Sequence, residues 1–343
     1  MTGPGDLPHL DGVLSASELA ATAEAIAALQ RPSGMIPWYP GGHCDPWNHV
    51  ETAMALTVAG RYAEAERAYD WLAATQRADG AWHNYYVEVD GRLEVEDPKL
   101  DTNVTAYVAT GVWQHWLVTE DKGFVEELWP MVERALGFVT SMQTPRGEIV
   151  WARHADHAPW DYALLTGSSS IAHSLRSGLA LADLLGEDRP QWAAAAERLE
   201  HVLTTMPHAF APKDRWAMDW YYPVIGGVLT GDDARARLRQ HWDTFVIDGR
   251  GVRCVSDEPW VTAAETAECA IAHAAIGDRT TAIELLRTTR LHRCDDGAYL
   301  TGIVYPHEVA FPEAETTAYT AAAVILAVDL VTGTSPAAEL FAH

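Results

Sequence analysis

One turn recurs along this chain and constrains its fold more than any other feature. It reads Gln-x-x-x-Gly, with a tryptophan soon after, and its three copies lie at 30–38, 76–82 and 143–151. Each copy follows a helical stretch, where glycine suits a helix end that turns through a left-handed residue. Gly251 and Gly297 occupy the same place later in the chain, and a loop at 206–216 supplies a sixth turn without the glycine. Such regular spacing predicts repeated helical hairpins.

Each turn separates two helical segments of different character. The segments before the turns are amphipathic and charged, at 17–30, 62–76, 123–143, 190–206, 232–245 and 279–291. The segments after the turns are apolar all round and rich in Ala, Thr and Ser, at 45–60, 101–119, 167–185, 219–229, 258–277 and 313–333. An outer ring and an inner ring of helices require this alternation. We therefore predict an all-α fold, an (α/α)6 barrel of six helical hairpins, forming a single domain over 1–343 with an N-terminal extension at 1–14.

The charge of the chain narrows the classes of ligand. Asp and Glu total 48 against 24 Lys and Arg, which gives a formal net charge of −24. A field of this sign repels phosphate backbones and anionic membrane surfaces, so we expect neither nucleic acid nor membrane as a partner. A neutral ligand, such as a sugar, is compatible with it. The sequence does not decide the oligomeric state.

Cysteine usage and hydropathy indicate the compartment. The four cysteines form no C-x-x-C pair, and the first residues lack a basic region followed by an apolar one, so no secretory signal is recognised. The longest apolar helical run, 319–330, is too short to cross a bilayer. Unpaired thiols without a signal predict a cytoplasmic protein.

The chemistry is expected where the inner helices begin. All inner helices of such a barrel point the same way, so their N-termini converge on one rim, and these N-termini carry carboxylates beside aromatic residues. That combination is typical of sugar sites, because ring faces stack on aromatics and acids serve hydroxyl groups. The predicted substrate-binding residues are His43, Trp47, Asn103, Trp220, Tyr221, Trp260 and Glu315. The tryptophans could equally be core aromatics.

Four acids are the candidate catalytic residues. Asp45 precedes Pro-Trp at a predicted helix start, and helix N-termini favour anions, so it suits a general base. Glu265 lies inside an alanine-rich helix, which should disfavour its ionised form and suits a general acid. Asp101 and Glu258 are the alternatives. Helix capping explains Asp45, Asp101 and Glu258 equally well, and pairing with Arg253 or with a backbone amide would explain Glu265.

The sequence predicts no metal site and no cofactor. His43, His49, His115 and His307 do not have the spacing of zinc ligands. No Gly-rich phosphate loop is present, and Ser168 lacks the glycine pattern of a nucleophile elbow.

Six motifs carry a resemblance to a known family: HCDPWNHVETAMAL, DTNVTAYVATGVWQHW, ALLTGSSSIAHSL, MDWYYPVIGG, EPWVTAAETAE and TTAYTAAAVILAVDL. With the Gln-x-x-x-Gly turns, they resemble the six-hairpin glycosidases and, within these, the actinobacterial family typified by a mycobacterial hydrolase of methylmannose polysaccharide. The resemblance covers about 29–340. It implies metal-independent acid-base cleavage of internal α-mannosidic bonds, mostly with inversion, in an oligo- or polysaccharide.

The resemblance leaves the acids open. In glucoamylase-like relatives the two acids come from the third and sixth inner rims, which here would mean Asp161 with Glu308, Glu313 or Glu315. The richest rims of this sequence are the first and fifth. Two other functions remain possible on the same architecture: a non-catalytic carbohydrate-binding toroid, and a prenyltransferase or terpene-cyclase-like enzyme.

Overall fold

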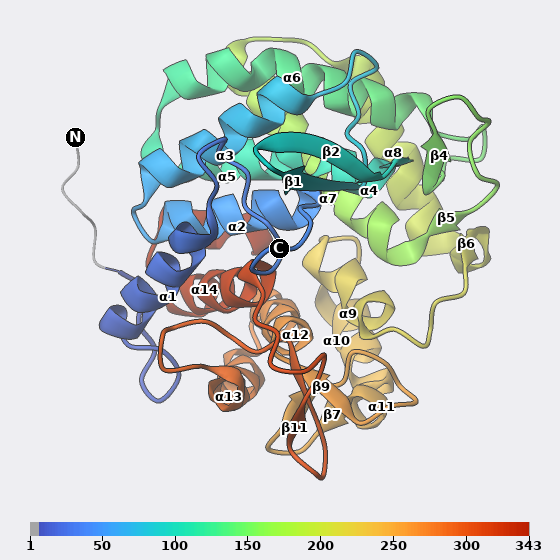
Figure 1. Ribbon diagram of the computed structural model, residues 1–343. Helices are drawn as coiled ribbons and strands as arrows, with labels where there is room; N and C mark the ends of the chain where they lie inside the picture. Colours follow the sequence, from blue (N-terminus) through green and yellow to red (C-terminus); the bar gives the residue numbers. More distant parts are fainter. Residues whose placement is uncertain (1–6, 343) are drawn as a thin grey trace.

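The computed structural model describes residues 7–342, and two concentric rings of helices dominate it (Figure 1). The inner ring consists of α2 (Pro46–Val58), α4 (Thr102–Ala106) continued by α5 (Val108–Thr119), α7 (Leu165–Leu185), α9 (Ala217–Ile225), α12 (Ala263–Ala275) and α14 (Ala318–Thr332). Each inner helix packs against the next, and α14 packs against α2, which closes the ring. The predicted (α/α)6 barrel is confirmed.

The outer ring covers the inner one. It consists of α1 (Ala16–Leu29), α3 (Tyr62–Thr75), α6 (Lys122–Ser141), α8 (Pro190–Thr205), α10 (Gly231–Gln240) with α11 (Trp242–Phe245), and α13 (Arg279–Thr288). Short 3-10 helices lie at η1 (Pro207–Ala209), η2 (Thr289–His292) and η3 (Pro336–Phe341). None of the described helices is long and apolar enough to cross a membrane.

The repeated glutamine joins neighbouring hairpins. Gln76 donates from Nε2 to the carbonyl oxygen of Gly80 and to that of Met131 on α6, both at 2.9 Å. Its Oε1 accepts from Nε and Nη2 of Arg134, at 2.9 and 2.6 Å. Gln30 makes the same contacts with Gly34, Glu64 and Arg67, and Gln143 makes them with Gly147, Ala195 and Arg198. The turn therefore binds each hairpin to the outer helix of the next.

The repeated glycine allows that contact. Gly80 has a φ of +91°, and a Cβ there would lie 2.2 Å from the carbonyl oxygen of Arg134. Gly297, in the last turn, approaches Ala21 in the same way, and Thr22 donates to its carbonyl oxygen at 2.9 Å. Because Ala21 and Thr22 lie on α1, the last turn meets the first outer helix. Only glycine permits such close approach at a left-handed backbone position.

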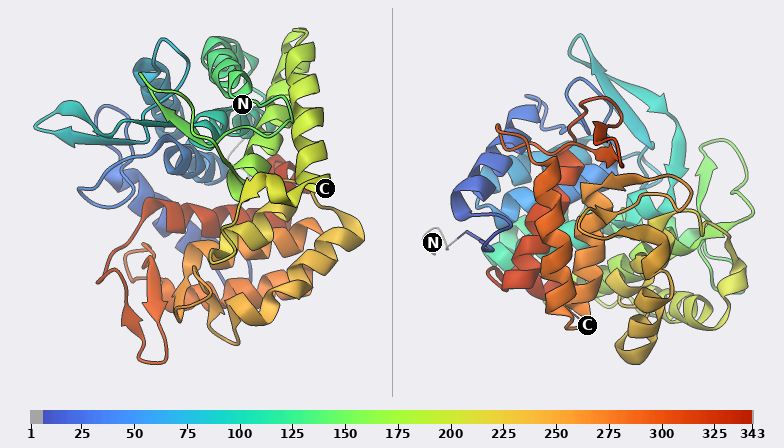
Figure 2. Two further views of the ribbon diagram at one scale, coloured as in Figure 1. Left: turned by 90° about the vertical axis from the view of Figure 1, so that its right-hand side faces the viewer. Right: turned by 90° about the horizontal axis from the view of Figure 1, so that it is seen from below.

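Short strands lie at the rim where the inner helices begin. They are β1 (Tyr85–Val89), β2 (Arg92–Asp97), β3 (Lys99–Asp101), β4 (Ala152–His154), β5 (Ala163–Leu164), β6 (Phe210–Ala211), β7 (Val246–Ile247), β8 (Gly251–Val252), β9 (Trp260–Thr262), β10 (Gly302–Val304) and β11 (Val309–Ala310). Two hairpins, β1–β2 and β10–β11, project from the barrel on the same side (Figure 2, left).

These strands correct two predicted helix starts. We expected inner helices to begin near 258 and 313, but α12 begins at Ala263 and α14 at Ala318. The residues before α12 instead form β9, which pairs with β10. Before α14, Thr316 forms an isolated bridge with Leu300, so extended pairing with the 300–304 segment precedes both helices.

Two glycine-to-alanine variants should separate the cost of a left-handed backbone from the cost of a clash with the neighbouring helix. Gly60→Ala places a Cβ at a φ of +72° with open space around it, and should cost about 1–2 kcal/mol. Gly80→Ala adds the clash with Arg134 and should cost at least about 1 kcal/mol more. Urea unfolding of both variants checks the difference, and equal losses of stability would contradict the role given to the turn.

Candidate functional site

A cavity of about 600 Å³ opens at the rim where the inner helices begin. Residues from all six inner-helix starts or their preceding loops line it, including Trp47, Asp101, Thr166, Asp219, Glu265 and Tyr319. The expected convergence of the inner helices on one site therefore occurs. Asp101 and Glu265, both predicted catalytic acids, lie in its wall.

Asp101 is held firmly in the wall. It caps α4, where its Oδ1 accepts from the backbone nitrogens of Asn103 and Val104 at 2.9 and 3.2 Å. Its Oδ2 accepts from Trp151 Nε1 and lies 4.0 Å from Lys99 Nζ. Burial raises the pKa of Asp101, while Lys99 and these hydrogen bonds oppose the rise. Both oxygens are engaged, so the carboxylate has a fixed orientation.

Asp45 caps the first inner helix, as predicted. Its Oδ1 accepts from the backbone nitrogen of Asn48 at 2.9 Å, and its Oδ2 accepts from the Asn48 side chain. Asp45 itself is buried and is absent from the described cavity lining, whereas Trp47 and Asn48 belong to it. Burial raises the pKa of Asp45 to about 6, with a further contribution from nearby Asp101.

Glu265 lies in the first turn of α12 and faces the cavity. Its Oε2 accepts from the hydroxyl of Thr262, the residue that caps the helix. No ion pair with Arg253 is formed in the part of the chain that the structure describes; Arg253 instead donates to the carbonyl oxygen of Ser256 at 3.5 Å. The pairing with Arg253 that would have explained Glu265 as a structural acid is therefore wrong.

The aromatic wall has free hydrogen-bonding groups. Trp47 stacks on Tyr107, with ring centroids 4.5 Å apart at 19°, and Tyr319 meets it edge-on at 5.8 Å. The indole nitrogens of Trp38 and Trp47 and the side-chain oxygen of Asn103 have no hydrogen-bond partner within residues 7–342. Buried polar atoms normally find partners, so these three groups are available to ligand hydroxyls.

Two predicted sugar-stacking residues lie elsewhere. Trp220 is 2% exposed, stacks on Phe245 at 5.5 Å and donates from Nε1 to the carbonyl oxygen of Arg237. Tyr221 is fully buried and donates to Glu268. Both are core residues and the prediction that they stack sugars is wrong. Only one face of α9 lines the cavity. The α9 residues on that face are Met218, Asp219 and Tyr222.

Of four other predicted residues, only Trp260 lines the cavity. Glu258 is exposed in the loop before β9 and does not line the cavity, because the helix it was expected to cap begins at Ala263. Glu315 is half-buried and accepts from Thr301 Oγ1 at 2.9 Å. His43 stacks on Tyr85 at 4.1 Å and lies 3.2 Å from Glu96. The glucoamylase-like pattern also suggested three other acids. All three are exposed: Asp161, Glu308 and Glu313.

Sequence reasoning missed several lining residues. Trp151 follows one of the Gln-x-x-x-Gly turns, and its position after the turn was the available signal. Trp38 follows the first such turn in the same way. The sequence did not indicate that Tyr222 and Tyr319 line the cavity, since a tyrosine in an apolar helix is usually a core residue.

Two further acids are buried below the cavity. Glu51 on α2 and Glu268 on α12 are 3% and 2% exposed, and burial is the largest cause that raises the pKa of each, that of Glu268 to about 8. The charge of Glu268 raises the pKa of Glu51 further, and that of Glu265 raises the pKa of Glu268. Tyr107 donates to Glu51 at 3.4 Å, and Tyr222 donates to Glu268 at 3.3 Å. These tyrosines support Trp47 from below. At neutral pH we therefore expect Glu268 to be largely protonated.

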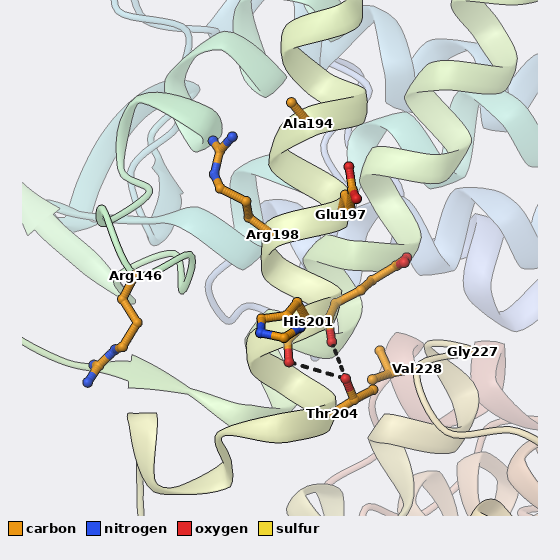
Figure 3. Close-up of a pocket in the computed structure, with 9 residues that line it drawn as sticks. Arg146, Ala194, Glu197, Arg198, His201, Thr204, Gly227 and Val228 are labelled. Atoms are coloured by element: carbon orange, nitrogen blue, oxygen red, sulfur yellow. Dashed lines mark hydrogen bonds between the residues drawn. The ribbon is translucent and has the colours of Figure 1, made fainter.

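Another cavity, of about 640 Å³, lies on the outer face of α8 (Figure 3). Its charged side chains are used in structural contacts: Arg198 donates to the repeated Gln143, Arg146 pairs with Glu148, and Glu200 pairs with Arg176. No inner helix N-terminus reaches it. It is therefore a weaker candidate for chemistry than the rim cavity.

The described side chains do not form a metal-binding cluster. Among residues 7–342, no three His, Cys, Asp or Glu side chains are grouped so as to hold a metal ion. The four cysteines are free thiols.

Comparison with known proteins decides the family. No family model matches the chain. An MMP endo-(1,4)-3-O-methyl-alpha-D-mannosidase of Mycolicibacterium hassiacum is 50% identical over 335 residues, which cover 98% of this chain and 92% of that protein. The chain belongs to this endo-mannosidase family. The family resemblance in the six motifs is thereby confirmed.

Solved structures show how widely the fold of this family is used. A wild-type glycosidase superposes with a TM-score of 0.72 at 16% identity, covering 93% of this chain and 98% of that one. A D-mannose isomerase reaches 0.67 at 12% identity, covering 91% and 97%. Such distant likenesses support the barrel alone, because one fold hosts different chemistries.

The buried acid pair gives a testable dependence of stability on pH. The pKa of Glu268 is about 8 in the folded protein against an ordinary value of 4.5, so the folded state holds a proton that the unfolded state releases. The stability contributed by this proton is present below pH 4.5 and is lost progressively up to about pH 8. Glu268→Gln should flatten the decline, measured by urea unfolding between pH 5 and 8. The exposed Glu126→Gln is the control and should leave the slope unchanged.

Proposed function

We propose that the protein is a glycoside hydrolase that cleaves internal α-mannosidic linkages of an oligo- or polysaccharide containing O-methylated mannose. The observation that carries the proposal is the 50% identity, over nearly the whole of both chains, to an endo-mannosidase of 3-O-methylmannose linkages. The cavity supports it, because acids and tryptophans with free polar groups face one space. We propose a metal-independent mechanism that inverts the anomeric centre.

Glu265 is our proposed general acid. It faces the cavity from the first turn of α12 among largely apolar neighbours, and its Oε2 accepts from the Thr262 hydroxyl. In this role it donates a proton to the leaving glycosidic oxygen as the bond to the anomeric carbon breaks.

Asp45 is our proposed general base. Its pKa of about 6 leaves it ionised at neutral pH but basic enough to accept a proton from water. Asp101 is a weaker choice, because four donors or cations already stabilise its negative charge. Asp45 and Glu265 begin α2 and α12, which flank α14 in the inner ring. An inverting enzyme needs its two carboxyl groups about 6.5–9.5 Å apart to admit water.

The remaining lining residues have binding roles in this proposal. Trp47 offers its face to a sugar ring, supported from below by Tyr107. The free Asn103 oxygen and the free indole nitrogens of Trp38 and Trp47 hydrogen-bond sugar hydroxyls. Asp101 orients a hydroxyl group. A non-catalytic carbohydrate-binding toroid would keep these contacts but would not need Asp45 and Glu265 as proton carriers.

The pKa of Asp45 sets the expected pH profile. Below about pH 6 the carboxylate is protonated and cannot accept a proton, so kcat/KM should fall about tenfold per pH unit. Initial rates of reducing-end release from a methylated manno-oligosaccharide between pH 4 and 8 measure this. A profile that stays flat down to pH 5 would count against Asp45 as the base.

Conservative variants of the two acids test their roles. Asp45→Asn retains a cap, because Asn caps helices nearly as well as Asp, but turnover should fall by about two to four orders of magnitude. Glu265→Gln should fall similarly, since it has no transferable proton. An activated nitrophenyl leaving group should partly rescue Glu265→Gln and not Asp45→Asn, because such a group needs little protonation.

Controls separate chemistry from folding. Both variants should melt within a few degrees of wild type, and the exposed Glu258→Gln should retain full activity. If both acid variants turn over like wild type, the assignment is wrong, and Asp101→Asn becomes the next variant to measure.

Chelator treatment tests metal independence. With no suitable ligand cluster in residues 7–342, dialysis against a chelator should leave the rate of hydrolysis unchanged. Loss of activity that added zinc, magnesium or calcium restores would refute the mechanism proposed here.

A further inference from the structure

A small sheet outside the cavity has two faces of different character. Strands β9, β10 and β11 pair antiparallel, with Val304 opposite both Trp260 and Val309, and Ile303 opposite both Val261 and Ala310. Because side chains alternate across a strand, Trp260, Val304 and Val309 share one face. Val261, Ile303 and Tyr305 share the other, where they form a buried cluster.

The first face is apolar and open. Val309 is 58% exposed and Phe311, two residues further on the same face, is 52% exposed. Trp260 and Val304 are half-buried. Exposed large apolar side chains are scarce on this strongly charged protein, and two of the most exposed ones in residues 7–342 lie side by side here. Grouped exposure of this kind marks binding surfaces.

Specific contacts with Phe311 and Gly302 hold Trp260 in place on this face. Its Nε1 donates to the carbonyl oxygen of Phe311 at 3.0 Å, and its ring meets that of Phe311 edge-on at 5.4 Å. A Cβ on Gly302 would lie 2.1 Å from Trp260 Nε1, so only glycine lets the indole lie across β10. Phe311 in turn donates from its backbone nitrogen to Gly302. Trp260 and Phe311 are thus fixed as a pair.

The apolar face continues the wall of the cavity. Trp260 lines the cavity and also belongs to the sheet, so a chain bound in the cavity that leaves past Trp260 meets Phe311 and Val309 next. The hairpin β10–β11 projects outward from the barrel on this side (Figure 2). The hairpin turn carries Glu308, which pairs with Arg250 from the turn between β7 and β8. Arg250 also covers the ring of Tyr305, which lies on the opposite face of the sheet.

We propose that this face, formed by Trp260, Val304, Val309 and Phe311, binds O-methylated sugar units of the same chain that occupies the cavity. The inference rests on the proposed function and deepens it. An O-methyl group replaces a hydroxyl donor with apolar surface, which gains free energy when it is buried against Val and Phe. Sugar ring faces stack on aromatic side chains. The face offers both kinds of contact and almost no hydrogen-bonding group, so it favours methylated over unmethylated units.

Binding and hydrolysis of matched saccharides test the proposal. The substrates are a long 3-O-methylated α-1,4-manno-oligosaccharide, its unmethylated equivalent, and a methylated tetrasaccharide that fills little more than the cavity. The variant is Val309→Ser/Phe311→Ser, and the control is Leu291→Ser, which alters another exposed residue (44%) in the 3-10 helix η2. Affinities are measured by calorimetry in the Glu265→Gln background, and rates in the otherwise wild-type enzyme.

We expect the double variant to bind the long methylated chain about tenfold more weakly and to raise its KM, with kcat unchanged. Affinity for the tetrasaccharide and the unmethylated chain should stay within about twofold. Equal weakening for all three saccharides, or no weakening for any, would overturn the proposal. So would wild-type self-association that the double variant abolishes in sedimentation, since a second copy would then cover the face. Failure of the proposed function looks different: wild-type enzyme would release no reducing ends from any saccharide.

Discussion

The joining of neighbouring hairpins in the first half of the barrel depends on the contact between each Gln-x-x-x-Gly turn and the next outer helix. The glutamine amide spans two carbonyl oxygens, one in its own turn and one in the neighbouring helix, while an arginine of that helix donates to its oxygen. The glycine removes the side chain that would hold the two backbones apart. Three turns make this contact, and the last turn makes a similar close approach where Gly297 meets α1. The inner helices can then converge on one rim.

The convergence of the inner helices on one rim places carboxylates where their ionised forms are disfavoured. Six helix starts in one place bring acids and aromatics together in a largely apolar space, where ionised carboxylates are disfavoured. The protein deals with this differently at each acid. Asp101 is stabilised by donors and Lys99, Asp45 is held by Asn48, and the deeper Glu268 is expected to retain a proton at neutral pH. The acids of the rim and those beneath it thus lie in different electrostatic surroundings, the condition under which acid and base roles separate.

The deeper acids and the outer sheet extend the site in opposite directions. Glu51 and Glu268 accept hydrogen bonds from Tyr107 and Tyr222, whose rings contact Trp47 in the cavity. Trp260 belongs both to the cavity wall and to the small outer sheet, where Gly302 makes room for its ring. A cavity that continues into an apolar face suits the proposed substrate, a chain that is bound along its length and cut in its interior.

The architecture and the helices that carry three of the four candidate acids follow from the sequence, because helical periodicity and turn glycines are local properties; Glu258 instead lies in the loop before β9. Asp45 and Asp101 as helix caps, and Glu265 in an inner helix, follow from these alone. Only the tertiary structure decided which side chains face the cavity. Trp220 and Tyr221 lie two and one positions before Tyr222, and about 100° of helical rotation per residue turns them into the core. The start of α12 was also beyond the sequence, since strand pairing between β9 and β10 joins segments about forty residues apart.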